Sequence, residues 1–193
     1  IYRGPSDCPG VLPVFPLSGA LLLPRGQMPL NIFEPRYLAM VDDALKSHRL
    51  IGMIQPEGGE GEAGSAPALA RVGCAGRITQ IGETGDGRYL LTLTGVARFH
   101  VEEELSVLTP YRQCRVDFTR FSVDFRARAG EEEVDRIRLI ASLRQFVEAY
   151  EIKVDWRGVE QAPNEALVNA LCMMCPFGAP EKQALLEAPD LRT

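Results

Sequence analysis

The sequence predicts an α+β protein in which a β-rich first part is followed by a helical second part. Alternating apolar residues flank the turn-forming triplet Gly85-Asp86-Gly87, which predicts a long β-hairpin. Apolar residues recur at helical spacing near residue 40, and this spacing dominates the chain after Phe125. We therefore expect an extended lead-in at residues 1–10, a β-rich part at residues 11–122 and a helical part at residues 123–193.

The β-rich part begins with a strand at residues 11–15, stopped by Pro16. A second strand should end near Phe33 and lie at the edge of its sheet, because Pro29 donates no ladder hydrogen bond. Pro35 then suits the first position of a helix that runs to about residue 47. Further strands are expected at residues 50–54, 69–81, 88–101 and 111–118. The Gly-rich, acidic segment 56–67 has little to bury, which predicts a mobile loop.

Three helices are expected in the second part. Residues 131–150 carry an apolar stripe that includes Ile137, and three glutamates in the first turn would favour the helix dipole. A loop around Trp156 should separate this helix from the next, which Asn164 is expected to cap and which runs to about residue 175. A third helix is expected at residues 180–188, between two prolines.

The composition limits the classes of partner. The net charge is −5, and 18 of the 21 basic residues are arginines that form no basic run. This balance argues against electrostatic capture of nucleic acid or of an anionic membrane, because such binding needs clustered positive charge. No apolar run is long enough for a membrane span. The five cysteines are scattered and odd in number, which favours a reduced, cytoplasmic protein.

Motifs for catalysis or cofactor binding are not found. None of the three lysines follows a glycine as a phosphate-binding loop requires, and the sequence lacks a G-x-S-x-G motif. Cys172 and Cys175 form a C-x-x-C pair at the end of a predicted helix, where the dipole does not favour a thiolate. We interpret them as packing residues, although a redox role stays open. We expect no catalytic residue, no metal site and no cofactor.

Three blocks of the sequence point to a known family. The segment L12–V41 contains the consecutive residues Phe33, Glu34, Pro35, Arg36 and Tyr37 at the start of a helix. A central block reads VGCAGRI at residues 72–78, and a third reads EKQALLE at residues 181–187. In this order they resemble the Lon substrate-binding domain, the N-terminal part of the ATP-dependent Lon protease. The domain also occurs alone in small bacterial proteins, and in modified form in cereblon-type receptors.

The resemblance implies a PUA-like β pseudo-barrel of about six strands followed by a helical bundle. It also implies a stand-alone member that lacks the ATPase and protease domains of Lon. Such a module would recognise unfolded or exposed apolar polypeptide segments without enzymatic activity, and a protease or chaperone is a further candidate partner. The oligomeric state, the client and the biological process stay open.

Phe33, Glu34, Arg36 and Tyr37 are the candidate substrate-binding residues, at the rim of an apolar groove. A structural role is the alternative: Glu34 would cap the helix, Arg36 would pair with a carboxylate and Phe33 would pack on Tyr37. Two other functions stay open. Other PUA-like proteins often bind RNA, and a cleft between the two parts could hold a small molecule.

Overall fold

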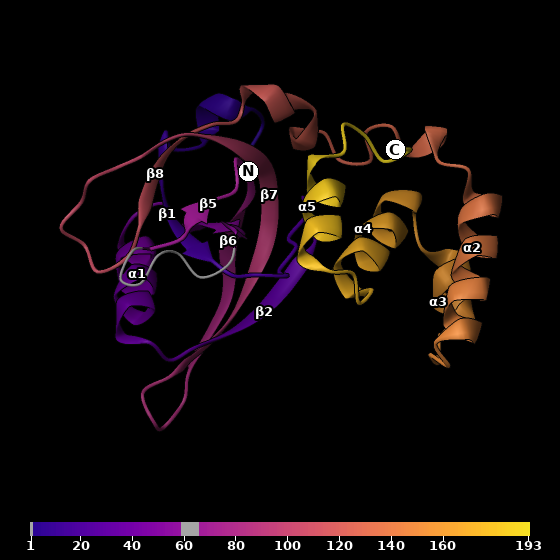
Figure 1. Ribbon diagram of the computed structural model, residues 1–193, viewed down its shortest axis with the longest axis horizontal. Helices are drawn as coiled ribbons and strands as arrows, with labels where there is room; N and C mark the ends of the chain where they lie inside the picture. The colour runs from indigo at the N-terminus through magenta and orange to yellow at the C-terminus, as the bar shows by residue number, and fades with distance from the viewer. Residues whose placement is uncertain (1, 59–65) are drawn as a thin grey trace.

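The computed structural model describes residues 2–58 and 66–193. In Figure 1 the strands and α1 lie on one side of the molecule, and α2 to α5 lie on the other. The eight strands are β1 (Val11–Pro16), β2 (Gln27–Ile32), β3 (Leu50–Ile54), β4 (Pro56–Glu57), β5 (Ala68–Leu69), β6 (Val72–Glu83), β7 (Tyr89–Glu104) and β8 (Gln113–Asp117) in the described part of the chain. The five α-helices in the same residues are α1 (Pro35–Lys46), α2 (Arg136–Ala149), α3 (Trp156–Gln161), α4 (Asn164–Met174) and α5 (Ala179–Glu187).

Six strands form one mixed sheet in the order β2-β7-β6-β3-β1-β8. Only the pairing of β1 with β3 is parallel among these described strands. β7 is long enough to pair with β2 at residues 89–94, with β6 at residues 89–100 and with β8 at residues 100–104. The sheet is therefore strongly curved, because β7, the second strand in this order, also bonds to β8 at the other end. This architecture confirms the predicted α+β class.

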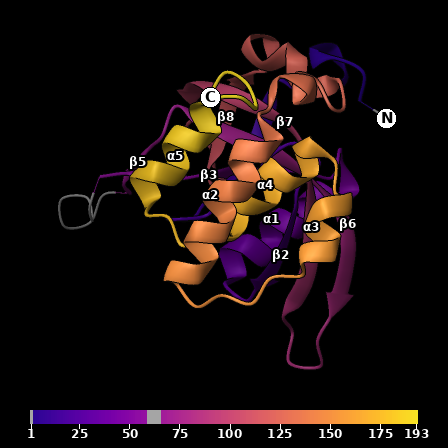
Figure 2. The same ribbon diagram turned by 90° about the vertical axis from the view of Figure 1, so that its right-hand side faces the viewer.

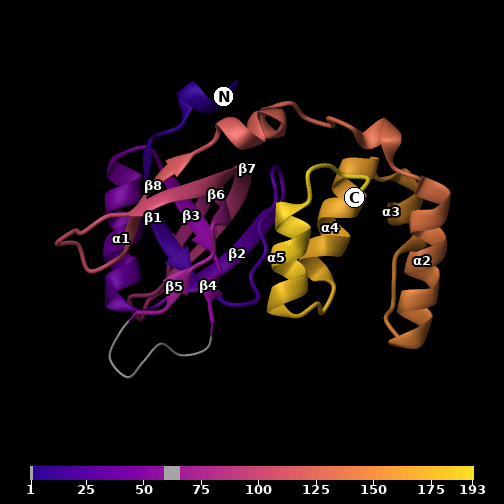
Figure 3. The same ribbon diagram turned by 45° about the horizontal axis from the view of Figure 1, so that its top comes forward.

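The curved sheet buries apolar side chains on both faces. All five residues of β3 are buried, and they alternate between two core clusters. One cluster includes Phe99 and is formed mainly by residues of β1, β3, β6, β7 and β8. The other joins the apolar face of α1 to β2, β6 and Leu186 of α5. Figure 3 shows α1 and α5 flanking the strands, so the sheet is covered by helices from both parts of the chain.

Most predicted elements of the first part are confirmed. The strands at β1, β2, β3, β6, β7 and β8 and the helix α1 lie where they were expected, and Pro35 occupies the first turn of α1. β2 is at the edge of the sheet, as Pro29 indicates. The tip of the β6–β7 hairpin has Gly87 at a positive φ of 81° and extends beyond the helices in Figure 2.

Two predictions in the first part need correction. The lead-in is not wholly extended, because residues Pro5–Asp7 form a 3-10 turn whose Asp7 carboxylate accepts bonds from two preceding backbone N–H groups. The segment 56–67 is not wholly a loop, since its start pairs with residues beyond it as β4 and β5. The predicted mobile centre of that segment, residues 59–65, lies outside the described residues.

The helical part differs more from the prediction. The glutamates Glu131–Glu133 form a separate 3-10 turn, and α2 begins only at Arg136 because Asp135 caps it by accepting a bond from the Arg138 N–H. Ile137, assigned to the buried stripe, is 85% exposed. The expected loop around residue 156 contains α3, and Pro163 rather than Asn164 occupies the N-cap of α4. α5 is confirmed.

Two tyrosine–aspartate bonds join α1 to β7 and to the connection before β8. The Tyr89 hydroxyl donates to Asp42 at 2.9 Å, and the Tyr111 hydroxyl donates to Asp43 at 2.7 Å. Burial, followed by the bond to Asp43, raises the pKa of Tyr111 to about 12. The folded protein therefore resists ionisation of this phenol.

Tyr111→Phe should test this bond. At neutral pH we expect the variant to lose about 1 kcal/mol of unfolding free energy, the usual net value of one hydrogen bond. The folded pKa lies above the ordinary value of 10, so the contribution is complete below pH 10 and is lost as the pH rises toward 12. Urea unfolding between pH 10 and pH 12 should show that the unfolding free energy falls less steeply with pH in the variant than in the wild type. Parallel curves would contradict the assignment.

Candidate functional site

The predicted site residues lie at the junction of β2 and α1. Tyr37 is buried, and its ring packs on Phe15 with centroids 4.3 Å apart. The Arg36 guanidinium lies over the Tyr37 ring at 4.6 Å, and its Nε bonds to the Glu34 carboxylate at 2.9 Å. Glu34 occupies the N-cap position but its side chain makes no capping bond. Three of the four residues are therefore engaged with one another or with the core.

Phe33 differs from the other three because it is 60% exposed. It follows the last residue of β2, and the Arg88 guanidinium lies 6.0 Å from its ring. The register of the sheet places Leu90 opposite Asn31, so Leu90 and Phe33 are diagonal neighbours on one face. Leu90 is 52% exposed.

These apolar side chains border a shallow depression of about 590 Å³ on β2, β6 and β7, formed by residues 29–31, 80–82 and 90–92. Ile81 within it is also exposed. β2 has β7 as its one strand neighbour among the described residues, so its second edge is not paired with a strand. Ile81 is paired with Leu91 and therefore lies on the opposite face of the sheet from Leu90. We call Phe33, Leu90 and the outer edge of β2 the edge surface.

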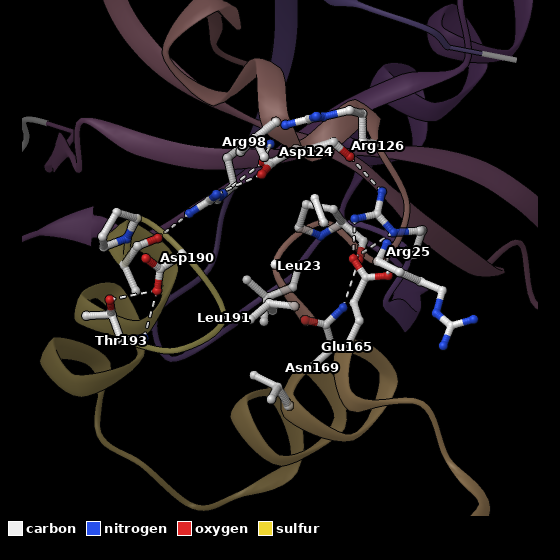
Figure 4. A pocket seen from close by; sticks show the side chains of 18 of the residues that line it. Leu23, Arg25, Arg98, Asp124, Arg126, Glu165, Asn169, Asp190, Leu191 and Thr193 are labelled. Atoms are coloured by element: carbon white, nitrogen blue, oxygen red, sulfur yellow. Dashed lines mark hydrogen bonds and ion pairs between the residues drawn. The ribbon is translucent and has the colours of Figure 1, made fainter. Parts of the chain in front are cut away.

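A second hollow lies between the sheet and the helical part. It has a volume of about 560 Å³ and combines apolar and charged lining residues (Figure 4). Its apolar lining includes Leu23, Val168 and Leu185. We call this hollow the central cavity.

Arg98 of β7 occupies one wall of the central cavity and is almost fully buried. Its Nε and Nη2 donate to the two carboxylate oxygens of Asp124 at 2.8 and 2.7 Å, and its backbone N–H donates to the same carboxylate at 2.9 Å. Its Nη1 donates to the carbonyls of Leu186 and Ala188 at 3.1 and 2.6 Å. These carbonyls at the end of α5 have no partner within the helix, so an arginine is a suitable cap.

Arg25 and Glu165 form the opposite wall. Arg25 Nε donates to Glu165 at 3.0 Å, and Arg25 Nη1 donates to the carbonyl of Asp124 at 2.6 Å. The second oxygen of Glu165 accepts the backbone N–H of Arg128 at 3.0 Å. Arg25 is held at a positive φ of 65°. Glu165 of α4 thus joins the segment before β2 to the connection that leads into the helical part.

A close backbone crossing fixes the position of Arg25. The Arg25 N–H donates to the carbonyl of Gly95 in β7, and the Gly95 N–H donates to the carbonyl of Gly26. A Cβ at Gly95 would lie only 2.0 Å from the Leu23 carbonyl oxygen. Only glycine permits this approach. Asn169 of α4 completes the crossing by donating to the Pro24 carbonyl at 2.9 Å.

The charged groups of the central cavity are paired, and the thiols of the C-x-x-C pair are protonated at neutral pH. The buried charges of Arg98, Asp124 and Glu165 are used in ion pairs and backbone bonds. Burial raises the pKa of the Cys172 thiol to about 11 and also raises that of Cys175, which disfavours thiolates at neutral pH. Within residues 2–58 and 66–193, no three His, Cys, Asp or Glu side chains form a group that could hold a metal ion.

The charged residues of the central cavity are not among the site residues predicted from the sequence. One signal was available, because Arg98 stands between Ala97 and Phe99 in a strongly apolar strand, and such an arginine needs a buried partner. Its partner Asp124 lies 26 residues away in the 3-10 segment Thr119–Phe125, which no periodicity reveals. Glu165 and Arg25 are 140 residues apart.

Among the helices described, none is long and apolar enough to cross a bilayer.

Comparison with known proteins gives consistent matches. The family model described as the ATP-dependent protease La (LON) substrate-binding domain matches residues 11–193. Lon protease 2 of Myxococcus xanthus is 29% identical over 191 residues, which cover 96% of this chain and 22% of that protein. The Lon protease of Anaeromyxobacter dehalogenans (strain 2CP-C) is 30% identical over 133 residues, or 69% of this chain and 15% of that protein. The chain thus spans less than a quarter of the length of these curated relatives.

Two solved structures share the fold. The crystal structure of a Lon N-terminal domain protein from Xanthomonas campestris has a TM-score of 0.60 at 23% identity, covering 94% of this chain and 92% of that one. The N-terminal domain of the Mycobacterium avium complex Lon protease has a TM-score of 0.65 at 18% identity, covering 94% and 91%. At these identities the likeness establishes the fold alone.

Arg98→Met should be strongly destabilising. It leaves the Asp124 carboxylate and two carbonyls buried without their partner, and we expect a loss of about 3–5 kcal/mol of unfolding free energy. Arg115→Met is the matched control, because Arg115 pairs with Glu103 at 3.5 Å on the exposed surface and should cost less than about 1 kcal/mol. Denaturant unfolding compares the two. Equal losses would show that the buried pair has no special role.

Gly95→Ala should disturb the backbone crossing. The added Cβ cannot fit against the Leu23 carbonyl, so strand and loop must separate, at an expected cost of about 1–3 kcal/mol. Gly82→Ala in β6 is the control, because the nearest atom to its Cβ is 4.0 Å away. Thermal unfolding measures both variants. If Gly95→Ala is as stable as Gly82→Ala, the backbone crossing does not require glycine at position 95.

Proposed function

Because the chain belongs to the LON substrate-binding domain family, we propose that it is a polypeptide-recognition module whose client binds along the edge surface. The observation that carries this proposal is the unpaired edge of β2 beside the exposed side chains of Phe33 and Leu90. An extended client would add a strand to β2 through main-chain hydrogen bonds. Its alternate side chains would then contact the depression on β2, β6 and β7.

The local sequence supports this mode of binding. Proline is tolerated on the outer side of an edge strand, so Pro29 indicates which backbone groups of β2 face outward. Backbone groups two residues apart point to the same side of a strand, so Asn31 also presents its N–H to an added strand. Gln27, Pro29 and Asn31 are exposed. Main-chain bonds to this edge would accept many client sequences, while Phe33 and Leu90 would favour apolar ones.

Of the four residues suggested by the sequence, Phe33 is the one that would contact the client. Arg36 and Tyr37 are assigned to support, because their side chains stack on one another and Tyr37 packs on Phe15. Glu34 holds Arg36 in that position. The four residues thus remain part of one proposed site with different roles.

The proposed module acts without catalysis. It would hold or deliver clients to a partner protease or chaperone in the cytoplasm, since the paired charges and protonated thiols described above offer no activated nucleophile. RNA is less well supported as a ligand. Arg98 and Arg25, two arginines of the central cavity, are paired with carboxylates, and the whole chain carries a net charge of −5.

Leu90→Asp tests the edge surface. We expect about tenfold weaker binding of a reduced, carboxymethylated unfolded protein, because an apolar contact is lost and a charge must be desolvated. Leu108→Asp is the matched control: Leu108 is fully exposed in the β7–β8 connection and lies outside the edge surface. Fluorescence anisotropy of the labelled client measures both affinities.

Asn31→Pro is a second, independent test of client binding at the edge of β2. It should keep the pairing of β2 with β7 but remove one outward donor, so binding should weaken while thermal stability changes little. Equal affinities for the wild type, Leu90→Asp and Asn31→Pro would reject the edge surface as the binding site. Failure of the wild type to bind at millimolar client would reject polypeptide recognition itself.

A further inference from the structure

The central cavity is partly filled by the chain itself. Residues 188–191 and Thr193, which follow α5, line it together with Leu23, Val168 and Leu185. Leu191 is partly buried and lies in the same part of the cavity as Leu23 in Figure 4. Residues 188–193 have neither helical nor strand structure. A short bent segment that carries one leucine therefore covers part of the cavity.

This segment is held to the rest of the protein at few points. Arg98 Nη1 donates to the Ala188 carbonyl at 2.6 Å. The hydrogen bonds recorded for residues 189–193 are internal: the Asp190 carboxylate accepts from the N–H groups of Arg192 and Thr193 and from the Thr193 hydroxyl, at 2.8 to 3.0 Å. Among the described residues, the Arg98–Ala188 bond thus connects this segment to the rest of the protein, and the Leu191 side chain is partly buried.

We infer that the central cavity is a second peptide site, specific for a bent segment with a leucine three residues after a carbonyl that Arg98 binds. Residues 188–193 are its built-in occupant and compete with clients for it. The inference rests on the proposed function of polypeptide recognition but concerns a different surface from the β2 edge. The chemistry of the ligand is taken from the segment already seated there: a main-chain carbonyl at Arg98 and a leucine beside Leu23.

Competition between residues 188–193 and a client determines how much the client affinity should change when the segment is released. A ligand for a site that is open only a fraction of the time binds more weakly by that fraction. If the segment closes the cavity about nine-tenths of the time, its release strengthens client binding about tenfold. Substitutions that unseat the segment without altering the cavity walls should therefore increase affinity. Loss of a leucine contact would ordinarily be expected to decrease it.

The test uses the full chain and the labelled peptide Ala-Pro-Asp-Leu-Arg-Thr, which repeats residues 188–193. Leu191→Ser should bind this peptide about tenfold more tightly than the wild type in fluorescence anisotropy. Asp190→Ala removes the internal bonds of the segment, not the leucine, and should shift affinity in the same direction. The same peptide with serine in place of leucine should not bind either variant. Circular dichroism confirms that both variants are folded.

The outcomes separate this inference from the proposed function. Leu90→Asp should leave binding of the hexapeptide unchanged, so failure at the edge surface does not remove the cavity site. Folded Leu191→Ser and Asp190→Ala variants that bind the peptide no better than the wild type would overturn the inference. Sedimentation that shows a dimer dissociated by Leu191→Ser would also overturn it, because the segment would then fill the cavity of a second copy.

Discussion

The buried guanidinium of Arg98 is the interaction on which the arrangement of the two parts depends. Arginine carries five N–H donors in a rigid planar fork and stays charged when buried. Here the fork satisfies both oxygens of Asp124 and two carbonyls at the end of α5. The Phe121 ring lies 4.6 Å from the guanidinium carbon. One side chain of β7 thereby fixes the sheet, the connection after it and the last helix.

The physical consequence is that the two parts cannot separate cheaply. Opening them would expose or orphan a carboxylate, an arginine and two carbonyls in an apolar setting, which costs more than breaking an exposed pair. The pair of Arg25 and Glu165 repeats this principle on the other wall of the cavity. Both proposed binding surfaces are therefore built on a rigid support. The close crossing at Gly95 connects them, because it places the chain that continues directly into β2.

Local signals predicted the elements of the first part well and those of the second part less well. Prolines, glycines and alternation are strong signals, and Pro29, Pro35 and Gly87 lie where their backbone constraints require. In the helical part, the apolar pattern placed Ile137 in the core although it is exposed. Short helices have weak periodicity, and a single capping residue such as Asp135 decides where a helix starts.

Local patterns in the sequence were sufficient to predict the α+β class, the edge position of β2 and the β6–β7 hairpin, because these follow from properties of neighbouring residues. It also marked Phe33, Glu34, Arg36 and Tyr37 as a distinctive group, without showing which of them is exposed. Tertiary structure alone decided that Phe33 is exposed while Tyr37 is buried, and that Arg98 meets Asp124 and the end of α5. Such contacts join residues 26 to 140 positions apart. Their partners are selected by the packing of the whole chain, which no local pattern encodes.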